Sequence, residues 1–524
     1  MMRVLNVFIG SEQIGSLFEN NGIWSFKYDE GWSSHGYPLS PGLPLSNEAL
    51  VDAATTRPVQ WFFDNLLPED AARAKLFTSM GRNQGDAWDL LEQFGAESAG
   101  ALTLLPLGAS LPEPGLRPLS DADLNARILA MPKEPLSRNA PKKMSLAGAQ
   151  EKLPVVMGAD GSLFDPIGAT PSTHILKPNV LSDSYPASAV NEWFCSRVAH
   201  ELNIRVPNVE LRHIPSSVFI IERFDRVQRV GGTERLHALD AVQLLSVAAG
   251  AKYAKAGVEA LRDVAEKCRV KATTRVNLFR WTLFNALIGN GDAHLKNLSF
   301  VATHEGYALA PHYDLVSTGA WARPEIVAQG QPTWPNVELS FPVGNARTFR
   351  ELTPADLVRF GEELGVPKEI SFREIARMTA NILPAAEKVM KEYEARKDVP
   401  LNVKAGQDRM VRAIIYLPLK TMQQQLTVGP SVDRNAEGRD VPSTIVDPQV
   451  TGTLREIASD PKDPNSRILH MTRAGKDVQV PVPSMVVESL SPDIKPGATI
   501  RIRRGKSGVT IEAHGPKKGR KLER

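Results

Sequence analysis

The amino-acid sequence predicts an α+β fold in two lobes, with an N-terminal α/β subdomain before them and a small C-terminal β-rich domain after them. Apolar residues recur at helical spacing over residues 276–288, which is typical of a buried helix. Short alternating strands precede this helix around residues 4–9 and 24–26, and another group follows residue 478. Helical and strand-like stretches are thus both present, in separate parts of the chain.

Breaks in these patterns divide the chain into segments. At 524 residues it is long enough for three or four compact units, each with its own core. We expect an N-terminal subdomain at 1–105, a connecting segment rich in proline and leucine at 106–143, a small lobe at 144–226, a helical large lobe at 227–398 and an accessory β-rich domain with a basic tail at 399–524.

The loop after the predicted helix carries the most informative residues. Gly289 is a suitable helix stop, and Asp292 and Asn297 follow it five residues apart, the interval of the catalytic loop of protein kinases. Residues 298–301 and 307–310 read as a hairpin, which would return Asp314 to the side of Asn297. Asn297 and Asp314 would then offer oxygen ligands to Mg²⁺, and Asp292 would accept the proton of an attacking hydroxyl.

Turns alone could explain one such residue, because Asp and Asn suit loops. Turns explain poorly why three of them flank one hairpin, so the site interpretation is favoured and the fold is predicted to be protein-kinase-like. Lys296 lies in the same loop, where it could approach the transferred phosphate or be solvated.

The stretch upstream supplies candidates for binding ATP. Small residues in Ser145-Leu-Ala-Gly-Ala-Gln-Glu-Lys152 would let backbone N–H groups approach phosphate oxygens, although such residues most often form a plain turn. Lys177 lies on a short strand and could pair with phosphates, or it could be solvated. Glu192, on the next helix, could steady Lys177 by an ion pair or could be an ordinary surface residue. The strand at 218–221 leads to the predicted adenine-binding hinge, or simply ends in a surface ion cluster.

In this order the motifs resemble the HipA family of bacterial serine/threonine kinases, the toxin halves of type II toxin–antitoxin pairs. The matching pieces, over roughly residues 3–395, are Trp61-Phe-Phe-Asp-Asn-Leu-Leu-Pro-Glu69, Ser145-Leu-Ala-Gly-Ala-Gln-Glu-Lys152, Thr170-Pro-Ser-Thr-His-Ile-Leu-Lys177, Asn191-Glu192, Glu222-Arg-Phe-Asp-Arg226, Gly291-Asp-Ala-His-Leu-Lys-Asn297 and Tyr313-Asp314.

The resemblance implies a role for each site residue. Asp292 would be the catalytic base, and Asn297 and Asp314 would hold Mg²⁺. The residues that would bind ATP are Ser145, Gly148, Gln150, Lys152, Lys177 and Lys296, with backbone contacts to adenine from Glu222 and Phe224. Ser145 would also be autophosphorylated, which ejects its loop and stops the kinase, and Glu192 would support Lys177.

The resemblance also implies targets and partners. Aminoacyl-tRNA synthetases would be phosphorylated on a serine, causing growth arrest, and a HipB-type antitoxin would be the partner and could bring DNA contact. A small-molecule or lipid kinase remains an alternative, because the site specifies the phosphate donor better than the acceptor. The chain differs from protein kinases in having Asp314-Leu315-Val316 in place of Asp-Phe-Gly, and in lacking an Ala-Pro-Glu element.

Composition agrees with a soluble protein of the cytoplasm. Apolar residues make up 42% of the chain and charged residues 23%, which is ordinary for a globular protein. The chain has two cysteines, Cys195 and Cys268. We therefore expect no disulfide framework, and we expect the protein to lie in a reducing compartment. We find no signal segment and no uninterrupted apolar span near 18 residues, so no membrane partner is predicted.

The last 125 residues fall outside the resemblance. Strands are predicted at 478–482, 499–502 and 509–511, an order faintly similar to AbrB-type DNA-binding domains. Residues 501–524 hold nine Lys or Arg against two Glu, a net charge of +7 that could neutralise nucleic-acid phosphates or could simply be solvated. An alternative function is therefore a DNA-bound regulator whose C-terminal domain is a built-in antitoxin or operator reader.

Overall fold

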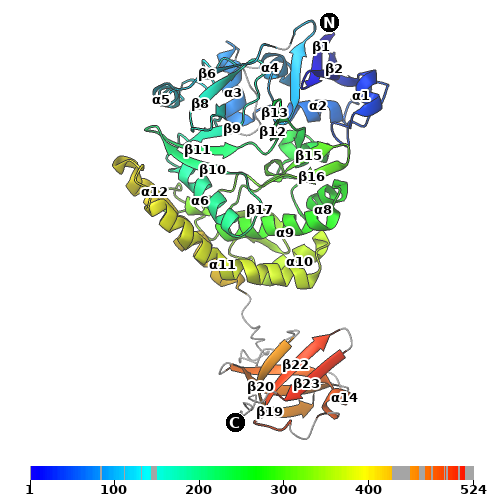
Figure 1. Ribbon diagram of the computed structural model, residues 1–524, viewed down its shortest axis with the longest axis vertical. Coiled ribbons are helices and arrows are strands. Elements are labelled where there is room, and N and C mark those ends of the chain that lie inside the picture. The colour runs from blue at the N-terminus through cyan, green and yellow to red at the C-terminus, as the bar shows by residue number, and fades with distance from the viewer. Residues whose placement is uncertain are drawn as a thin grey trace, which may run out of the picture. The chain divides into compact units, whose positions relative to one another are not determined.

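The computed structural model describes residues 2–82, 85–110, 112–131, 133–142, 150–427, 449–459, 466–473, 476–488, 490, 494–505 and 508–513. The chain forms two compact units, Met1–Thr427 and Val428–Arg524 (Figure 1). Among the described helices, none has the length and apolar character needed to cross a membrane.

The N-terminal subdomain is an antiparallel sheet covered by short helices. The strand order is β4-β3-β2-β1-β5, and Leu5 and Val7 of the first strand point into the core, as the alternating sequence predicted. The elements are β1 (Arg3–Ile9), β2 (Glu12–Asn20), β3 (Ile23–Tyr28), α1 (Glu30–His35), β4 (Leu50–Val51), α2 (Pro58–Asp64), α3 (Asp70–Ser79), α4 (Ala87–Phe94) and β5 (Leu102–Pro106).

The small lobe is built on a second antiparallel sheet, in the order β10-β11-β9-β7-β8-β6. Its elements are β6 (Gly115–Pro118), α5 (Asp121–Ala130), β7 (Leu153–Met157), β8 (Leu163–Ile167), β9 (His174–Pro178), α6 (Ser188–Glu201), β10 (Val209–His213) and β11 (Ser217–Glu222). Val218 and Ile220 pack in one core with α5, whereas Phe219 and Ile221 pack in another with α6. Both faces of β11 are therefore covered, which explains its continuous apolar run.

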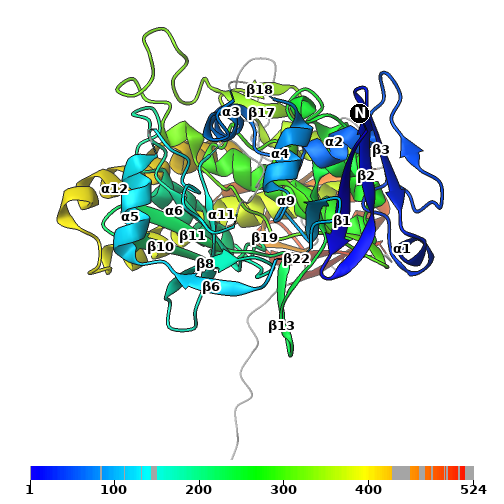
Figure 2. The same cartoon turned by 90° about the horizontal axis from the view of Figure 1, so that it is seen from above.

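The predicted connecting segment at 106–143 is wrong as a linker, because it supplies a strand and a helix of the small lobe. β6 pairs with β8, and Leu124 and Ile128 of α5 pack on the sheet with Val155. Viewed from above, α5 and the sheet of the N-terminal subdomain lie at opposite sides of the first unit (Figure 2).

The large lobe surrounds the central helix α9, which is buried along most of its length. Its elements are β12 (Arg226–Arg229), β13 (Gly232–Arg235), β14 (Ala238–Asp240), α7 (Ala241–Leu244), η1 (Ala249–Ala251), α8 (Val258–Lys267), α9 (Lys271–Ile288), η2 (Leu295–Asn297), β15 (Ser299–Thr303), β16 (Gly306–Leu309), η3 (Thr318–Ala320), β17 (Glu338–Val343), β18 (Ala346–Thr348), α10 (Pro354–Leu364) and α11 (Lys368–Glu394). The predicted hairpin is present: β15 and β16 pair in antiparallel register.

The first unit continues past the predicted boundary at residue 399. Residues 401–426 form α12 (Leu401–Ile414), the π-helical turn η4 (Ile415–Leu419) and α13 (Lys420–Leu426), which pack on α6, α9 and α11. Met410 and Ile414 belong to the main core. The accessory domain therefore begins later than the sequence patterns suggested, because this helical stretch closes the kinase-like body.

The second unit is a five-stranded antiparallel sheet in the order β21-β20-β19-β22-β23. Its elements are β19 (Gln449–Ser459), β20 (Ser466–Arg473), β21 (Lys476–Pro483), α14 (Ser484–Glu488), β22 (Thr499–Gly505) and β23 (Gly508–Ala513). The three predicted strands lie within β21, β22 and β23. β19 and β20 were not predicted, although Val450 and Leu454 alternate with polar residues and join the core.

Candidate active site

The loop that carries the candidate base begins where α9 is forced to stop. Gly289 has a φ of +67°, in the left-handed region where a side chain is disfavoured. A Cβ at this position would also lie 2.8 Å from side-chain atoms of Pro418 and Trp334, so space and backbone conformation both require glycine. The chain therefore leaves the helix at a fixed point and enters the loop at Asn290.

Asp292 and Asn297 are held together within this loop. The Asn297 side-chain nitrogen donates to the Asp292 carbonyl oxygen at 3.0 Å, and the Asp292 N–H donates to the Asn290 side chain at 3.0 Å. Asp292 itself is exposed, whereas Asn297 is buried. Since the Asn297 amide uses its nitrogen on the loop, its carbonyl oxygen is the atom left to serve as a metal ligand.

The hairpin brings Asp314 back to the same place. Tyr313, the residue before it, donates its hydroxyl to the Lys296 carbonyl oxygen at 2.9 Å, one residue from Asn297. The Tyr313 hydroxyl also lies 2.7 Å from that of Ser299. Asp314 has a φ of +53°, which is uncommon for a residue other than glycine; such a conformation costs roughly 1–3 kcal/mol and persists only where the surroundings hold it.

Lys177 connects the small lobe to this acidic residue. Its ammonium pairs with Glu192 of α6 at 2.7 Å, which is the predicted ion pair, and also with Asp314. Burial would raise the pKa of Asp314, but Lys177 and Lys152 outweigh it and lower that pKa to about 2. Burial raises the pKa of Glu192 to about 7 against the opposing effect of Lys177. Asp314 is thus a carboxylate at neutral pH, with a cation already beside it.

Asn191 fixes the segment after Asp314 to the same helix. Its side-chain amide donates to the Ser317 carbonyl oxygen at 3.0 Å and accepts from the Ser317 N–H at 2.8 Å. Both atoms of the amide are therefore used on one backbone unit. The neighbouring residues Asn191 and Glu192 thus hold two parts of the site: the Asp314 segment and Lys177.

The predicted phosphate loop is described only at its end. Ser145 and Gly148 lie outside the described residues. The Gln150 side chain donates to the Pro178 carbonyl oxygen at 3.2 Å, next to Lys177 on the strand. Burial, and then repulsion from Lys177, lower the pKa of Lys152 to about 8. Leu153 of β7 pairs with Leu176 of β9, so the neighbouring residues Lys152 and Lys177 bring two cationic groups near each other.

The predicted hinge is partly occupied by internal bonds. The Glu222 N–H donates to the Asn208 carbonyl oxygen at 2.9 Å, so a contact of Glu222 with adenine would have to use its own carbonyl oxygen. The Phe224 ring stacks on Tyr313 with centroids 5.8 Å apart, which places the hinge beside the Asp314 segment. Backbone contacts to adenine remain a prediction.

Lys296 has other partners than those expected. Its Nζ lies 2.9 Å from Glu69, 2.9 Å from the Asn65 side chain and 3.5 Å from Asp240. The solvated alternative is wrong, because the ammonium is buried and ion-paired. Contact of Lys296 with ATP stays a prediction. For that contact, the Lys296 ammonium would have to leave these partners. Glu69 also pairs with Lys252 at 2.5 Å, and we call Asn65, Glu69, Asp240, Lys252 and Lys296 the loop cluster.

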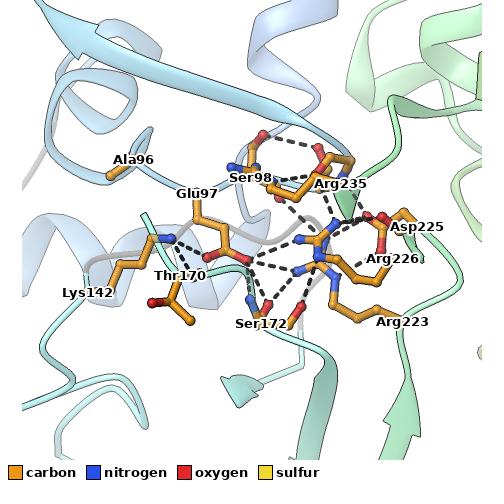
Figure 3. Close-up of polar contacts among 12 residues, drawn as sticks. Ala96, Glu97, Ser98, Lys142, Thr170, Ser172, Arg223, Asp225, Arg226 and Arg235 are labelled. Carbon is orange, nitrogen blue, oxygen red and sulfur yellow. Dashed lines mark hydrogen bonds and ion pairs between the residues drawn. The ribbon is translucent and has the colours of Figure 1, made fainter. Parts of the chain in front are cut away.

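A second group of charges joins the N-terminal subdomain to the hinge (Figure 3). Glu97 pairs with Lys142 at 2.6 Å and with Arg226 at 3.1 Å, and Arg223 pairs with Asp225 at 2.7 Å. Burial, and then the neighbouring Arg223, lower the pKa of Arg226 to about 9. We call Glu97, Lys142, Arg223, Asp225, Arg226 and Arg235 the hinge cluster; it holds four cationic groups and two carboxylates, all buried or half-buried.

Comparison with known proteins identifies the family. The HipA N-terminal domain matches residues 5–105 and the HipA-like C-terminal domain matches residues 144–390. Y4mE of Sinorhizobium fredii, named as a candidate kinase, is 31% identical over 436 residues, covering 79% of this chain and all of Y4mE. The chain belongs to the HipA family.

One further relative, compared by sequence and by solved structure, agrees with this assignment. The serine/threonine-protein kinase toxin HipA of Shewanella oneidensis is 29% identical over 407 residues, covering 74% of this chain and 89% of that protein. A solved structure of Shewanella oneidensis HipA with HipB and operator DNA matches with a TM-score of 0.64 and 26% identity, covering 81% of this chain and 99% of the solved one. The two-lobed, kinase-like α+β fold and the family expected from the sequence are confirmed.

Several residues of this HipA protein were not recognised as part of the site from sequence. Asn65 and Glu69 reach the candidate catalytic loop from the N-terminal subdomain, and Lys252 and Tyr253 reach it from the segment after η1. The available signal was the motif at 61–69, which resembled the family without suggesting a role. Spacing along the chain could not reveal these contacts, because Asn65 and Lys296 are 231 positions apart.

Proposed function

We propose that this chain is an ATP- and Mg²⁺-dependent serine/threonine protein kinase of the HipA toxin type. The observation that carries the proposal is the meeting of Asp292, Asn297 and Asp314 around one hairpin, with the buried pair Lys177–Glu192 beside them. Protein kinases use these residue types in these positions for phosphoryl transfer. The kinase names of the relatives support the same reaction class.

The residues present suit a magnesium ion. Asn297 and Asp314 would supply two oxygen ligands, and the Asp314 carboxylate is ionised; its pair with Lys177 would be exchanged when the ion binds. Among the described residues, no three His, Cys, Asp or Glu side chains gather as a dedicated metal cage. That pattern fits Mg²⁺, which is bound through one or two protein groups together with phosphates and water. The ion would offset negative charge on the phosphates.

The protein's own part is to position the reactants and to accept a proton. Lys177, steadied by Glu192, would pair with phosphate oxygens once its bond to Asp314 is exchanged, and Lys152 would add a second positive charge. Asp292 would align the serine hydroxyl and take its proton as the γ-phosphoryl group is transferred. Little covalent work falls to the protein, so preorganised charge supplies most of the effect.

For the acceptor, we propose a serine on a translation component such as an aminoacyl-tRNA synthetase, and Ser145 of the chain itself, with growth arrest as the result. The name of the Shewanella relative, a serine/threonine-protein kinase toxin, supports a serine acceptor and a toxic outcome. We also propose a HipB-type antitoxin as partner, because that relative was solved with HipB and operator DNA. The cytoplasm is the proposed location.

A second candidate function concerns the C-terminal unit, as a built-in antitoxin or operator reader. In β22 the positions of Arg501 and Arg503 alternate with Ile500 and Ile502, and these isoleucines lie in the core. The Arg501 position therefore lies on the strand face opposite the core. Binding of promoter DNA by the full chain, compared with a chain ending at Thr427 across a salt series, tests this. Equal affinity of the two chains, with a flat salt response, would remove the candidate.

Label transfer from ATP tests the kinase proposal. The purified chain, with Mg²⁺ and labelled ATP, should label itself and a synthetase, and Asp292→Ala should abolish the label. Asp263→Ala, at an exposed position on α8, is the matched control and should leave transfer unchanged. Transfer that survives Asp292→Ala would contradict the proposed base. Label found only in a lipid or small molecule would favour that other class of kinase.

A further inference from the structure

Tyr253 is hydrogen-bonded to Asp292, the candidate catalytic base, in this structure. It lies in the segment after η1, and its hydroxyl donates a hydrogen bond to the Asp292 carboxylate. The Tyr253 side chain is 45% exposed and Asp292 is exposed as well, so the contact lies where a large substrate could approach. The proposed function assigns no role to Tyr253.

The bond uses the group that the phosphate acceptor needs. A kinase base must accept a hydrogen bond from the attacking hydroxyl before it can take the proton. The Asp292 backbone is already held by Asn290 and Asn297, so its carboxylate is the part that can change partners. Burial, and then the bond to Asp292, raise the pKa of the Tyr253 phenol, which therefore stays a donor at neutral pH.

The surroundings keep Tyr253 in this place. The Leu295 N–H donates to the Lys252 carbonyl oxygen at 3.4 Å, and the Lys252 ammonium pairs with Glu69 at 2.5 Å. The His294 ring meets the Tyr253 ring edge-on, with centroids 4.9 Å apart. The backbone and one side of the ring are thus anchored, whereas the side chain is partly exposed and can rotate away from Asp292 without breaking these backbone contacts.

We propose that Tyr253 is a substrate-positioning residue that holds the acceptor's place at Asp292 in the free protein and is displaced by the incoming serine hydroxyl. The inference rests on the proposed kinase function, because it requires Asp292 to be the base. Displacement sets the affinity for the acceptor: every substrate must replace one hydrogen bond before it binds productively. A hydroxyl that cannot replace the phenol at Asp292 is excluded.

The test compares full-length wild type with Tyr253→Phe, using a synthetic peptide of residues 141–152 in which Ser145 is the sole hydroxyl residue. The variant keeps the ring and loses the competing hydroxyl. We expect its KM for the peptide to fall about three- to tenfold, the net effect of one hydrogen bond, with kcat unchanged, because the competitor acts only in the free protein. Tyr416→Phe, at a tyrosine 57% exposed on η4, is the matched control.

The split between KM and kcat separates this role from simple bracing. If Tyr253 only steadied Asp292, Tyr253→Phe would lower kcat and leave KM unchanged, and the proposal would be wrong. An unchanged KM and kcat would also overturn it. Phosphotyrosine at position 253, found by mass spectrometry, would also overturn it, because Tyr253 would then be a phosphate acceptor and not a residue displaced by one. Wild type that transfers no phosphate at all would remove the proposed function, and this inference with it.

Discussion

Two carboxylates of the N-terminal subdomain reach the kinase body, and they do so in different ways. Glu97 is fully buried in the hinge cluster, where four cationic groups face only two carboxylates. Glu69 lies in the loop cluster, where Lys252 and Lys296 are balanced by Glu69 and Asp240. The first cluster joins the subdomain to the predicted hinge (Figure 3), and the second joins it to the candidate catalytic loop.

Because the hinge cluster and the loop cluster differ in charge balance, we expect one to affect mainly stability and the other mainly activity. Removing Glu97 would leave four buried cationic groups with a single carboxylate, and uncompensated buried charge is strongly destabilising. Removing Glu69 would still leave Lys296 with Asp240 and Asn65. We therefore expect the hinge cluster to determine whether the two parts stay folded together, and the loop cluster to determine how accurately Asp292 is placed.

The largest effect should come from Glu97→Gln. Loss of this carboxylate should lower the free energy of unfolding of the first unit by about 3–5 kcal/mol. Urea denaturation followed by tryptophan fluorescence measures the change. Glu48→Gln, an exposed position of the same subdomain, is the matched control and should differ from wild type by less than about 0.5 kcal/mol. A Glu97→Gln midpoint equal to that of the control would show that the cluster adds nothing.

Lowering the pH should remove the difference in unfolding free energy between wild type and Glu97→Gln. Burial alone would raise the pKa of Glu97, but Lys142 and the arginines outweigh it and hold the pKa well below its ordinary 4.5. Glu97 therefore stabilises the fold fully above pH 4.5, and its contribution is lost progressively as the pH falls further toward the folded-state pKa. The gap in unfolding free energy between wild type and Glu97→Gln should shrink below pH 4.5 and stay constant from pH 5 to 8. A gap that does not change with pH would contradict the assignment.

Glu69→Gln should affect catalysis more than stability. We expect kcat for peptide phosphorylation to fall about tenfold, because the catalytic loop loses part of its anchor, with KM for ATP unchanged. The unfolding midpoint should stay closer to wild type than that of Glu97→Gln. Steady-state rates at saturating ATP, with Glu48→Gln again as control, measure this. If Glu69→Gln were as unstable as Glu97→Gln and fully active when folded, the division of roles would be wrong.

The smallest effect concerns a lysine outside both clusters. At pH 8 roughly half of Lys152 is neutral, since its pKa lies near 8. Phosphate anions favour the charged form, so ATP binding should take up a fraction of a proton and should weaken as the pH rises above 8. Calorimetry in two buffers of different ionisation enthalpy measures the uptake. Lys152→Met should reduce it, whereas Lys267→Met, exposed on α8, should not.

The features that could be predicted from the sequence are those that depend on neighbouring residues. The α9 periodicity, the stop at Gly289 and the hairpin after Asn297 are all local, and together they brought Asp292, Asn297 and Asp314 close. The ion pair of Lys177 with Glu192 was one of two alternatives, taken by analogy with protein kinases, and the structure contains it.

Contacts between distant segments could not be predicted in this way. Nothing in the spacing of Glu69, Glu97 or Tyr253 shows that each meets a particular charged group, because burial and pairing arise only when separate segments pack. The boundary at residue 399 was wrong for a different reason. Residues 401–426 have helical periodicity of their own, as Met410 and Ile414 in the core show, but the strands beyond them dominated the assignment.

The left-handed backbone of Asp314 decides how its role can be isolated. Alanine at this position would remove the carboxylate and also disfavour the conformation, so lost activity would mix two causes. Asparagine tolerates that conformation and differs from aspartate mainly in charge. Asp314→Asn should therefore give a catalytically silent but correctly shaped protein, suitable as bait for capturing the natural acceptor from cell extracts.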